Sequence, residues 1–131
     1  MTTRSGGCLC GQVRFTTTGE PANVRFCHCR LCQKAMGGPS FARALFPRAA
    51  IAIDGQTEHF PSSERIVRVF CPRCGTRIMA ERVDGSFAGL ALTLFDDPDA
   101  WAIECHMFTE TKVPWLVLGD GLPQYPQRPP A

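Results

Sequence analysis

The spacing of its cysteines constrains this chain more than any other feature of its sequence. Eight of the 131 residues are cysteine, and seven of them fall into three close groups. The groups are Cys8 and Cys10, then Cys27, Cys29 and Cys32, and then Cys71 and Cys74. Thiols clustered in so short a chain form either disulfides or metal sites.

Residues 1–7 contain no apolar stretch of the kind found in signal peptides. The sequence also has no run of about 18 or more apolar residues that would span a membrane. We therefore expect a cytoplasmic protein without a membrane segment. Thiols stay reduced in the cytoplasm, where clustered cysteines usually hold metal, so metal binding is the favoured interpretation.

The segment 71–75 reads Cys-Pro-Arg-Cys-Gly, which is the pattern of a zinc knuckle. Its tight turn directs both sulfurs at one point, and the glycine can take the positive φ that this turn needs. A redox Cys-x-x-Cys motif is the alternative, but that motif is typical of a strand-to-helix junction. Because the segment lies between two predicted strands, residues 66–70 and 77–82, a pair of zinc ligands is favoured.

Cys8 and Cys10 are two residues apart, so in an extended segment both side chains point to the same side and can face one ion. A structural zinc ion takes four ligands in a tetrahedron. Together with Cys71 and Cys74 these two cysteines would supply all four and would tie the N-terminal segment to the middle of the chain. Spacing alone does not fix which groups share an ion, and this partition is a hypothesis.

The second group places three thiols within six residues, from Cys27 to Cys32. Three protein ligands with one open position are typical of a catalytic zinc site. A fourth ligand would instead close the site, and three residues are candidates for it: His28, Cys105 and His106. His28 lies between two of the cysteines in sequence, so its imidazole would have difficulty reaching the same ion. For Cys105, the simpler interpretation is a small buried apolar residue.

Short segments of β-branched and aromatic residues separated by turn signals indicate a mainly β protein with packed sheets. The expected strands cover residues 12–17, 24–27, 40–46, 66–70, 77–82, 86–94 and 102–108. One or two helical turns are expected over residues 30–36, and another around Trp101. The length suits one domain, which we place over residues 1–120, followed by a proline-rich tail over residues 121–131.

The charge of the chain argues against nucleic-acid binding. The formal net charge is only +2. The sequence has no stripe of lysine and arginine, no alternation of basic and aromatic residues, and no helix with base-reading spacing. We therefore expect no nucleic-acid partner.

Taken in order, the cysteine groups and their neighbours resemble the glutathione-dependent formaldehyde-activating enzyme family, also called the GFA or CENP-V/GFA family. The resemblance covers roughly residues 6–118. It rests on the segments 7–13 (GCLCGQV), 27–34 (CHCRLCQK), 38–41 (GPSF), 70–75 (FCPRCG) and 106–108 (HMF), with Trp115. Seven cysteines at compatible spacings make it far more specific than a lone Cys-x-x-Cys motif.

The resemblance implies a β-tent zinc-binding fold, built of packed antiparallel sheets with zinc knuckles, and two zinc ions per chain. It assigns the seven cysteines to two sites, the structural zinc with Cys8, Cys10, Cys71 and Cys74 and the catalytic zinc with Cys27, Cys29 and Cys32. It also implies a carbon–sulfur lyase of the S-hydroxymethylglutathione synthase type, in which glutathione or another small thiol adds to formaldehyde or a related small aldehyde. Fold and ligands transfer within such a family better than the substrate does.

Other side chains are weaker candidates for the site. The histidines that could move a proton are His28, His59 and His106, and the last lies in a family motif. The cations that could attract an anionic thiol are Arg30, Lys34, Arg43 and Arg48. A packed or solvent-facing role is the simpler interpretation of each. Phe41 and Phe46 are expected in the core, whereas Trp101 and Trp115 could be core or pocket wall.

Two functions of other classes stay open at this point. The chain could be a non-catalytic zinc-binding structural or interaction module, or a thiol redox protein that uses Cys27, Cys29 and Cys32 without metal. An enzyme should bind a thiol, and a binding module should retain a macromolecule. A redox protein should change under mild oxidant without losing a tightly held ion.

Overall fold

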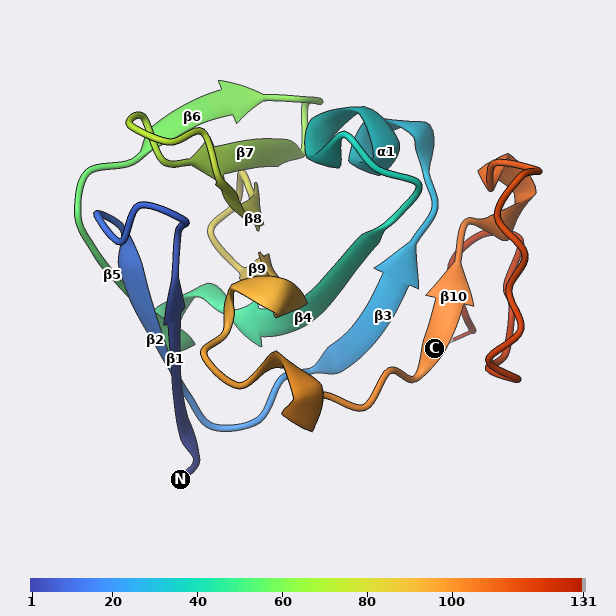
Figure 1. Cartoon of the computed structure of the whole chain (residues 1–131), viewed down its shortest axis with the longest axis horizontal. Helices are drawn as coiled ribbons and strands as arrows, with labels where there is room; N and C mark the ends of the chain where they lie inside the picture. Colours follow the sequence, from blue (N-terminus) through green and yellow to red (C-terminus); the bar gives the residue numbers. More distant parts are fainter. Residues whose placement is uncertain (131) are drawn as a thin grey trace.

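The computed structural model describes residues 1–130 and shows a mainly antiparallel β structure with short helices in the connections (Figure 1). The strands are β1 (Thr3–Gly7), β2 (Arg14–Thr18), β3 (Asn23–Cys27), β4 (Phe41–Pro47), β5 (Ile51–Asp54), β6 (Glu58–Pro61), β7 (Ile66–Phe70), β8 (Arg77–Arg82), β9 (Phe87–Ala91) and β10 (Cys105–Met107). The helices are α1 (Arg30–Met36) and the short 3-10 helices η1 (Arg48–Ala50), η2 (Leu92–Leu94), η3 (Pro98–Ala100) and η4 (Thr109–Thr111). None of the helices in residues 1–130 has the length and hydropathy of a transmembrane helix.

The smaller sheet has the strand order β1-β2-β5, with both pairs antiparallel. Val13, Phe15 and Thr17 are all buried, which confirms that alternate residues of this segment share one face. β1 reaches the core through Gly6, where a Cβ atom would lie 2.3 Å from the carbonyl oxygen of Leu94. A glycine is therefore required where this edge strand packs closely against the residues that follow β9.

The larger sheet has the strand order β10-β3-β4-β9-β8-β7-β6. All of its pairs are antiparallel except β10 with β3, which is parallel. The sheet curves strongly, and α1, which connects β3 to β4, lies beside β7 near the other end of the strand order (Figure 1). This curvature brings residues of β3, α1 and β7 to one place.

Two groups of buried residues fill the interior. The larger one contains Phe15, Phe46, Leu90 and Phe95, and Trp101 packs against it. Edge-to-face aromatic contacts join Phe95 to Phe15 and to Trp101, with ring centroids 5.0 and 4.9 Å apart. The smaller group consists of Cys27, Cys32, Phe41, Ala91 and Met107, so it includes two cysteines of the second cysteine group, and the third, Cys29, packs against it. Trp101 is thus a core residue, whereas Trp115 is exposed.

The structure differs from the sequence-based expectations at several points. The predicted strand over residues 86–94 ends at Ala91, because the chain turns there into η2. The predicted strand over residues 102–108 is confined to β10. β1, β5 and β6 were not among the predicted strands. β1 is rich in glycine and polar residues, β5 is only four residues long, and β6 is exposed along its whole length.

The C-terminal segment, residues 119–130, runs along β10 without forming a long strand. The N–H groups of His106 and Phe108 donate to the carbonyls of Pro123 and Gln127, at 2.9 and 3.0 Å. The N–H group of Tyr125 donates in turn to the carbonyl of His106 at 2.9 Å. The boundary that we place between residues 120 and 121 stays a prediction, and residue 131 of the predicted tail lies outside the described residues.

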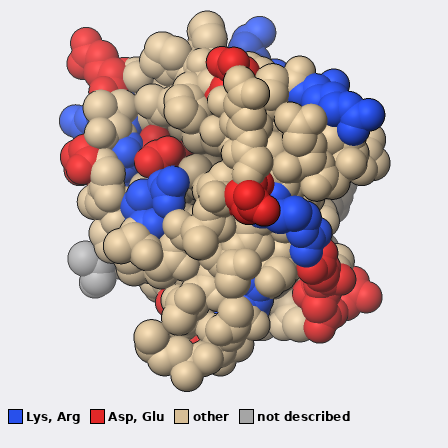
Figure 2. Space-filling view, turned by 90° about the vertical axis from the view of Figure 1, so that its left-hand side faces the viewer, with Lys and Arg blue, Asp and Glu red and all other residues tan. Residues whose placement is uncertain are grey.

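Charged side chains of both signs are interspersed on the face shown in Figure 2, between larger areas of other residues. Ion pairs on the surface include Arg4 with Glu20 at 3.1 Å and Arg14 with Asp96 at 2.6 Å. This mixture is in keeping with the small net charge of the sequence. The expectation that the chain binds no nucleic acid stays a prediction.

Candidate metal centres

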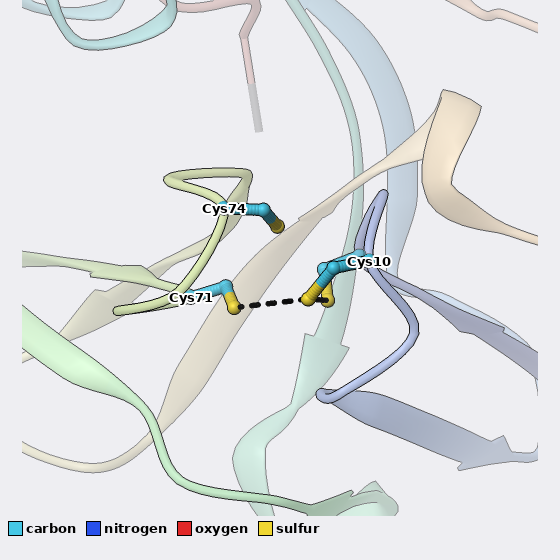
Figure 3. Close-up of side chains that lie close together, drawn as sticks. Cys10, Cys71 and Cys74 are labelled. Atoms are coloured by element: carbon cyan, nitrogen blue, oxygen red, sulfur yellow. Dashed lines mark hydrogen bonds between the residues drawn. The ribbon is translucent and has the colours of Figure 1, made fainter.

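The first and third cysteine groups meet in space. Their four sulfur atoms, from Cys8, Cys10, Cys71 and Cys74, all lie within 4.8 Å of one another. The sulfur of Cys10 is 3.6 Å from that of Cys8 and 3.8 Å from that of Cys71. Figure 3 shows how the loop after β1 presents Cys10 to the loop after β7, which presents Cys71 and Cys74. The four thiols therefore form one cluster, which we call the four-cysteine group.

Two tight turns aim these sulfurs. Gly11 and Gly75 have φ values of 81° and 76°, in the left-handed region that favours glycine. The N–H group of each donates back across its turn, Gly11 to the carbonyl of Cys8 at 3.1 Å and Gly75 to that of Cys71 at 2.9 Å. The positive φ expected of Gly75 is confirmed. A hydrogen bond from the Leu9 N–H to the Thr76 hydroxyl, 3.1 Å long, joins the two loops directly.

The four-cysteine group is suited to a tetrahedral ion. A zinc–sulfur bond of about 2.3 Å places tetrahedral ligands roughly 3.8 Å apart, close to the sulfur separations in the group. Hydrogen bonds from the hydroxyl and backbone of Thr76 lower the pKa of Cys74 to about 5, so this thiol is ready to act as a thiolate ligand. Four sulfurs leave no open position on such an ion.

The second cysteine group lies where β3 meets α1, and we call it the three-cysteine group. Cys27 ends β3, Cys29 caps the N-terminus of α1, and Cys32 lies in the first turn of that helix. Their sulfurs also lie within 4.8 Å of one another. Hydrogen bonds from the thiols of Cys27 and Cys32, and from the Cys32 N–H at 3.4 Å, lower the pKa of Cys29. These hydrogen bonds thus favour a thiolate at the middle cysteine of the group.

None of the three candidates for a fourth ligand joins the three-cysteine group within residues 1–130. His106 uses both ring nitrogens elsewhere, because its Nδ1 is 2.8 Å from His28 Nε2 and its Nε2 is 2.7 Å from Asp120 Oδ2. Cys105 is buried, as its apolar interpretation predicts. The three sulfurs would accordingly leave one position of a tetrahedral ion open.

A cavity of about 780 Å³ opens on the three-cysteine group. Its apolar wall includes Leu31, Phe41, Ile66, Met107 and Phe108. Its charged residues are Arg25, Arg43, Arg65, Arg68, Arg82 and Arg128, with Glu64 and Asp84. Six arginines against two carboxylates make the cavity positive, which suits an anionic ligand of small-molecule size. Phe41 belongs to both the buried core and this wall, whereas Phe46 is a core residue.

Two of these arginines are buried beside the cysteines. Both terminal nitrogens of Arg68, a residue only 7% exposed, lie 3.8 Å from the sulfur of Cys32. Its Nε donates to the hydroxyl of Ser62 at 3.0 Å, which fixes the guanidinium. Arg43 donates to the side-chain carbonyl of Asn23, and burial lowers the pKa of Arg43 to about 10. Arg43 therefore stays cationic at neutral pH, and both guanidinium groups lie where they would partly offset the charge of thiolates.

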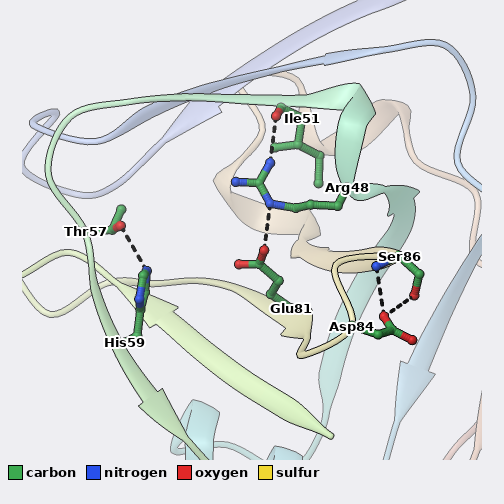
Figure 4. A network of polar contacts seen from close by, with 7 residues as sticks. All are labelled: Arg48, Ile51, Thr57, His59, Glu81, Asp84 and Ser86. Carbon is green, nitrogen blue, oxygen red and sulfur yellow. Dashed lines mark hydrogen bonds and ion pairs between the residues drawn. The ribbon is translucent and has the colours of Figure 1, made fainter.

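The four cations suggested by sequence proximity have different positions. Arg43 lines the cavity, whereas Arg30, Lys34 and Arg48 are not among its lining residues. Arg48 forms an ion pair with Glu81 at 3.0 Å and donates to the carbonyl of Ile51 at 2.8 Å (Figure 4). Arg30 donates to the side chain of Gln33 at 3.0 Å.

His59 also lies away from the cavity and is exposed. Its Nε2 contacts the hydroxyl of Thr57 at 3.4 Å (Figure 4). Sequence reasoning missed Arg68, although a single arginine between Val67 and Val69 in a predicted strand was a signal that this side chain faces a functional or buried polar environment.

Comparison with known proteins places these features in a family. Residues 3–111 match the model of the family described as glutathione-dependent formaldehyde-activating enzyme. No curated protein matches the chain. Among solved structures, the chain is similar to the crystal structure of a Rhodobacter sphaeroides protein, a structural genomics target, with a TM-score of 0.55 and 17% identity. The alignment covers 92% of this chain and 98% of that one, and at this identity it shows the fold alone.

The family match spans most of the chain and includes all seven clustered cysteines. The chain therefore belongs to the glutathione-dependent formaldehyde-activating enzyme (GFA) family.

Proposed function

We propose that this protein is a zinc-dependent, carbon–sulfur lyase-like enzyme that adds a glutathione-type thiol to formaldehyde or a related small aldehyde. One observation carries the proposal. Three cysteine sulfurs lie within 4.8 Å of one another, with no fourth protein ligand among residues 1–130, and they face an arginine-lined cavity of about 780 Å³. This combination is typical of a catalytic ion that keeps a position for substrate.

Each cysteine group would hold one zinc ion. Cys8, Cys10, Cys71 and Cys74 would hold a structural ion, and Cys27, Cys29 and Cys32 would hold the catalytic one. Cys27, Cys29 and Cys32 would hold the ion, and the chemistry that a bound zinc ion would supply here is to favour the thiolate form of a thiol. The same three thiolates outnumber the charge of a divalent ion, so the site is better suited to presenting a thiolate than to polarising a carbonyl.

The surrounding residues would bind and orient the two reactants. Arginines on the cavity wall would pair with the carboxylates of a glutathione-type thiol. Arg68, held by Ser62 beside Cys32, would offset the negative charge that gathers around the sulfurs. Phe41 and Met107 give the region near the cysteines an apolar wall, which limits water and strengthens these charge interactions.

The overall reaction balances without a further reactant. A bond forms between the thiol sulfur and the aldehyde carbon, the π bond of the carbonyl breaks, and the proton of the thiol ends on the carbonyl oxygen. The reverse reaction breaks the same carbon–sulfur bond. Catalysis would then consist mainly of holding the thiolate sulfur against the carbonyl carbon in the correct orientation.

The experiment that tests the proposal compares two cysteine variants of the full chain. Cys29→Ser removes one ligand while serine can still cap α1, so the fold should persist. Cys105→Ala is the matched control, since Cys105 is buried and belongs to neither group. We expect Cys29→Ser to lose one zinc ion and the formation of the thiol–formaldehyde adduct, measured by NMR, and Cys105→Ala to keep both.

Unchanged adduct formation in Cys29→Ser would discard the proposed function. A wild-type protein that holds two ions but binds no small thiol would instead support a non-catalytic zinc module. Reversible disulfide formation within the three-cysteine group under mild oxidant, with the other ion retained, would support a redox role.

A further inference from the structure

A series of polar contacts leads from the C-terminal segment to His28, which lies between Cys27 and Cys29 of the three-cysteine group. Asp120 Oδ2 lies 2.7 Å from His106 Nε2, and His106 Nδ1 lies 2.8 Å from His28 Nε2. His28 has no exposed surface and His106 is 2% exposed, whereas the Asp120 side chain reaches the surface of the protein. Buried polar groups that are connected in this way hold one another in fixed orientations.

Several contacts hold the two imidazoles in place. The ring of Phe26 stacks on that of His106, with centroids 4.7 Å apart and planes 6° apart. The hydrogen bond from His106 lowers the pKa of Asp120, so this residue is a carboxylate and can only accept. His106 Nε2 therefore carries a hydrogen that points to Asp120, and the contact between His106 Nδ1 and His28 Nε2 holds one further hydrogen.

His28 links this series of contacts to the cysteines, because its backbone lies between Cys27 and Cys29. The N–H group of His28 donates to the carbonyl of Met107 at 3.0 Å. Its carbonyl accepts from the Gln33 side chain at 2.8 Å and from the Thr111 hydroxyl at 3.0 Å. The backbone of the ligand segment is thus fixed on both sides, and the imidazole of His28 provides a third point of attachment.

Asp120, the exposed member of this series of contacts, lies outside the part of the polypeptide that matches the family model. That match ends at residue 111. Asp120 opens the C-terminal segment, which hydrogen bonds along β10 from Pro123 to Gln127. Further along, Arg128 reaches the cavity that opens on the three-cysteine group. The C-terminal segment therefore meets the surroundings of the three-cysteine group twice, through the contact of Asp120 with His106 and through Arg128 on the cavity wall.

We propose that Asp120 is a positioning residue for the three-cysteine group, acting through His106 and His28. The inference rests on the proposed function only in that the three cysteines hold an ion. By fixing the imidazole of His28, Asp120 keeps the sulfurs of Cys27 and Cys29 in the arrangement that binds this ion. Groups that hydrogen bond directly to metal ligands typically change metal affinity by about 10–100-fold, and Asp120 acts through two further residues, so an effect at the lower end of this range is expected.

The test uses the full chain loaded with zinc, and separately with cobalt(II), whose absorption reports the geometry of its sulfur ligands. The variants are Asp120→Ala, which removes the carboxylate, and Asp120→Asn, which keeps the shape. Asp99→Asn is the control, because Asp99 is an exposed acid remote in sequence from all seven cysteines. Metal release to a chelator is followed for both ions in each protein.

We expect Asp120→Ala to weaken the more labile ion about tenfold and to shift its cobalt(II) spectrum, with a smaller effect for Asp120→Asn. The resistant ion of the four-cysteine group should be released as in the wild type, which separates positioning from a general loss of stability. The inference would be overturned if Asp120→Ala and Asp99→Asn released the labile ion equally. It would also be overturned if Asp120→Ala weakened the binding of both ions to the same extent. A wild-type chain that binds a single ion would already overturn the proposed function, before any Asp120 variant is compared.

Discussion

The two cysteine groups differ in how far apart their members lie along the chain. Cys10 and Cys71 of the four-cysteine group are 61 residues apart, and their loops belong to different sheets. The three-cysteine group extends only from Cys27 to Cys32, at one strand end and one helix start. The first group joins parts of the fold that are distant in sequence, and the second closes a single short loop.

We propose that this difference separates stability from chemistry. An ion that joins distant loops binds only when the fold has brought those loops together, so its binding energy is folding energy. An ion held within a few residues depends far less on the rest of the fold. It can keep an open position and face the arginine-lined cavity without weakening the fold. Substitutions in the two groups should then differ in their effects on stability and on activity.

The largest effect is expected from Cys71→Ser, which removes a buried ligand from the four-cysteine group. A structural zinc ion contributes about 10–16 kcal/mol in zinc-finger peptides, whereas a whole domain is stable by only about 5–15 kcal/mol. We therefore expect no cooperative thermal unfolding of this variant when it is followed by circular dichroism. A Tm within a few degrees of that of Cys105→Ala would show that the four-cysteine group does not hold the fold together.

A much smaller loss of stability is expected from Cys29→Ser, although this variant should lose adduct formation. The short loop contributes little closure entropy, and serine keeps the helix cap. We expect a loss of about 1 kcal/mol, equivalent to a decrease in Tm of about 4 °C. Differential scanning calorimetry of Cys29→Ser and Cys71→Ser in parallel compares their losses of stability. Similar unfolding of the two variants would remove the distinction between the groups.

The charge beside the three-cysteine group is tested by Arg68→Met and Arg68→Lys. Methionine fills a similar volume without a charge, and lysine keeps the charge but loses the two contacts to Cys32. We expect kcat/KM for adduct formation to fall about tenfold or more in Arg68→Met and less in Arg68→Lys. Arg30→Met, outside the cavity, is the control and should behave as the wild type. A wild-type rate in Arg68→Met would exclude a role for this cation.

The smallest effect is expected from Arg48→Met, which lies away from both groups. Its partly buried ion pair with Glu81 should contribute about 0.5–1 kcal/mol, and both metal ions should be retained. Chemical denaturation with metal analysis measures both quantities. Loss of either ion in this variant would indicate that metal binding depends on general stability and not on the two separate groups.

The sequence predicted the parts of this molecule that depend on local spacing. The cysteine pairs, the glycine turn after Cys74, α1 and β8 follow from patterns within a few residues. Arg68 is 36 residues from its contact Cys32, and the two meet only because the larger sheet curves. The apolar neighbours of Arg68 signal a buried polar environment, but no local pattern shows that this arginine meets Cys32.

Asp120 was missed for a different reason. It borders a proline-rich stretch that resembles an irregular tail, and its role depends on a contact with His106 that no spacing indicates. The edge strands β1 and β6 were missed because neither shows the regular alternation of apolar residues on which the strand predictions rest.

The most direct test of the division between the two groups is the zinc content per chain, measured while a chelator of increasing strength is added. The account predicts two zinc ions per wild-type chain, one removed readily with the fold intact and one removed only together with unfolding. Cys29→Ser should lack the readily removed ion alone. Two equally resistant ions, or a single resistant ion in the wild type, would contradict an open three-cysteine site beside a closed four-cysteine site.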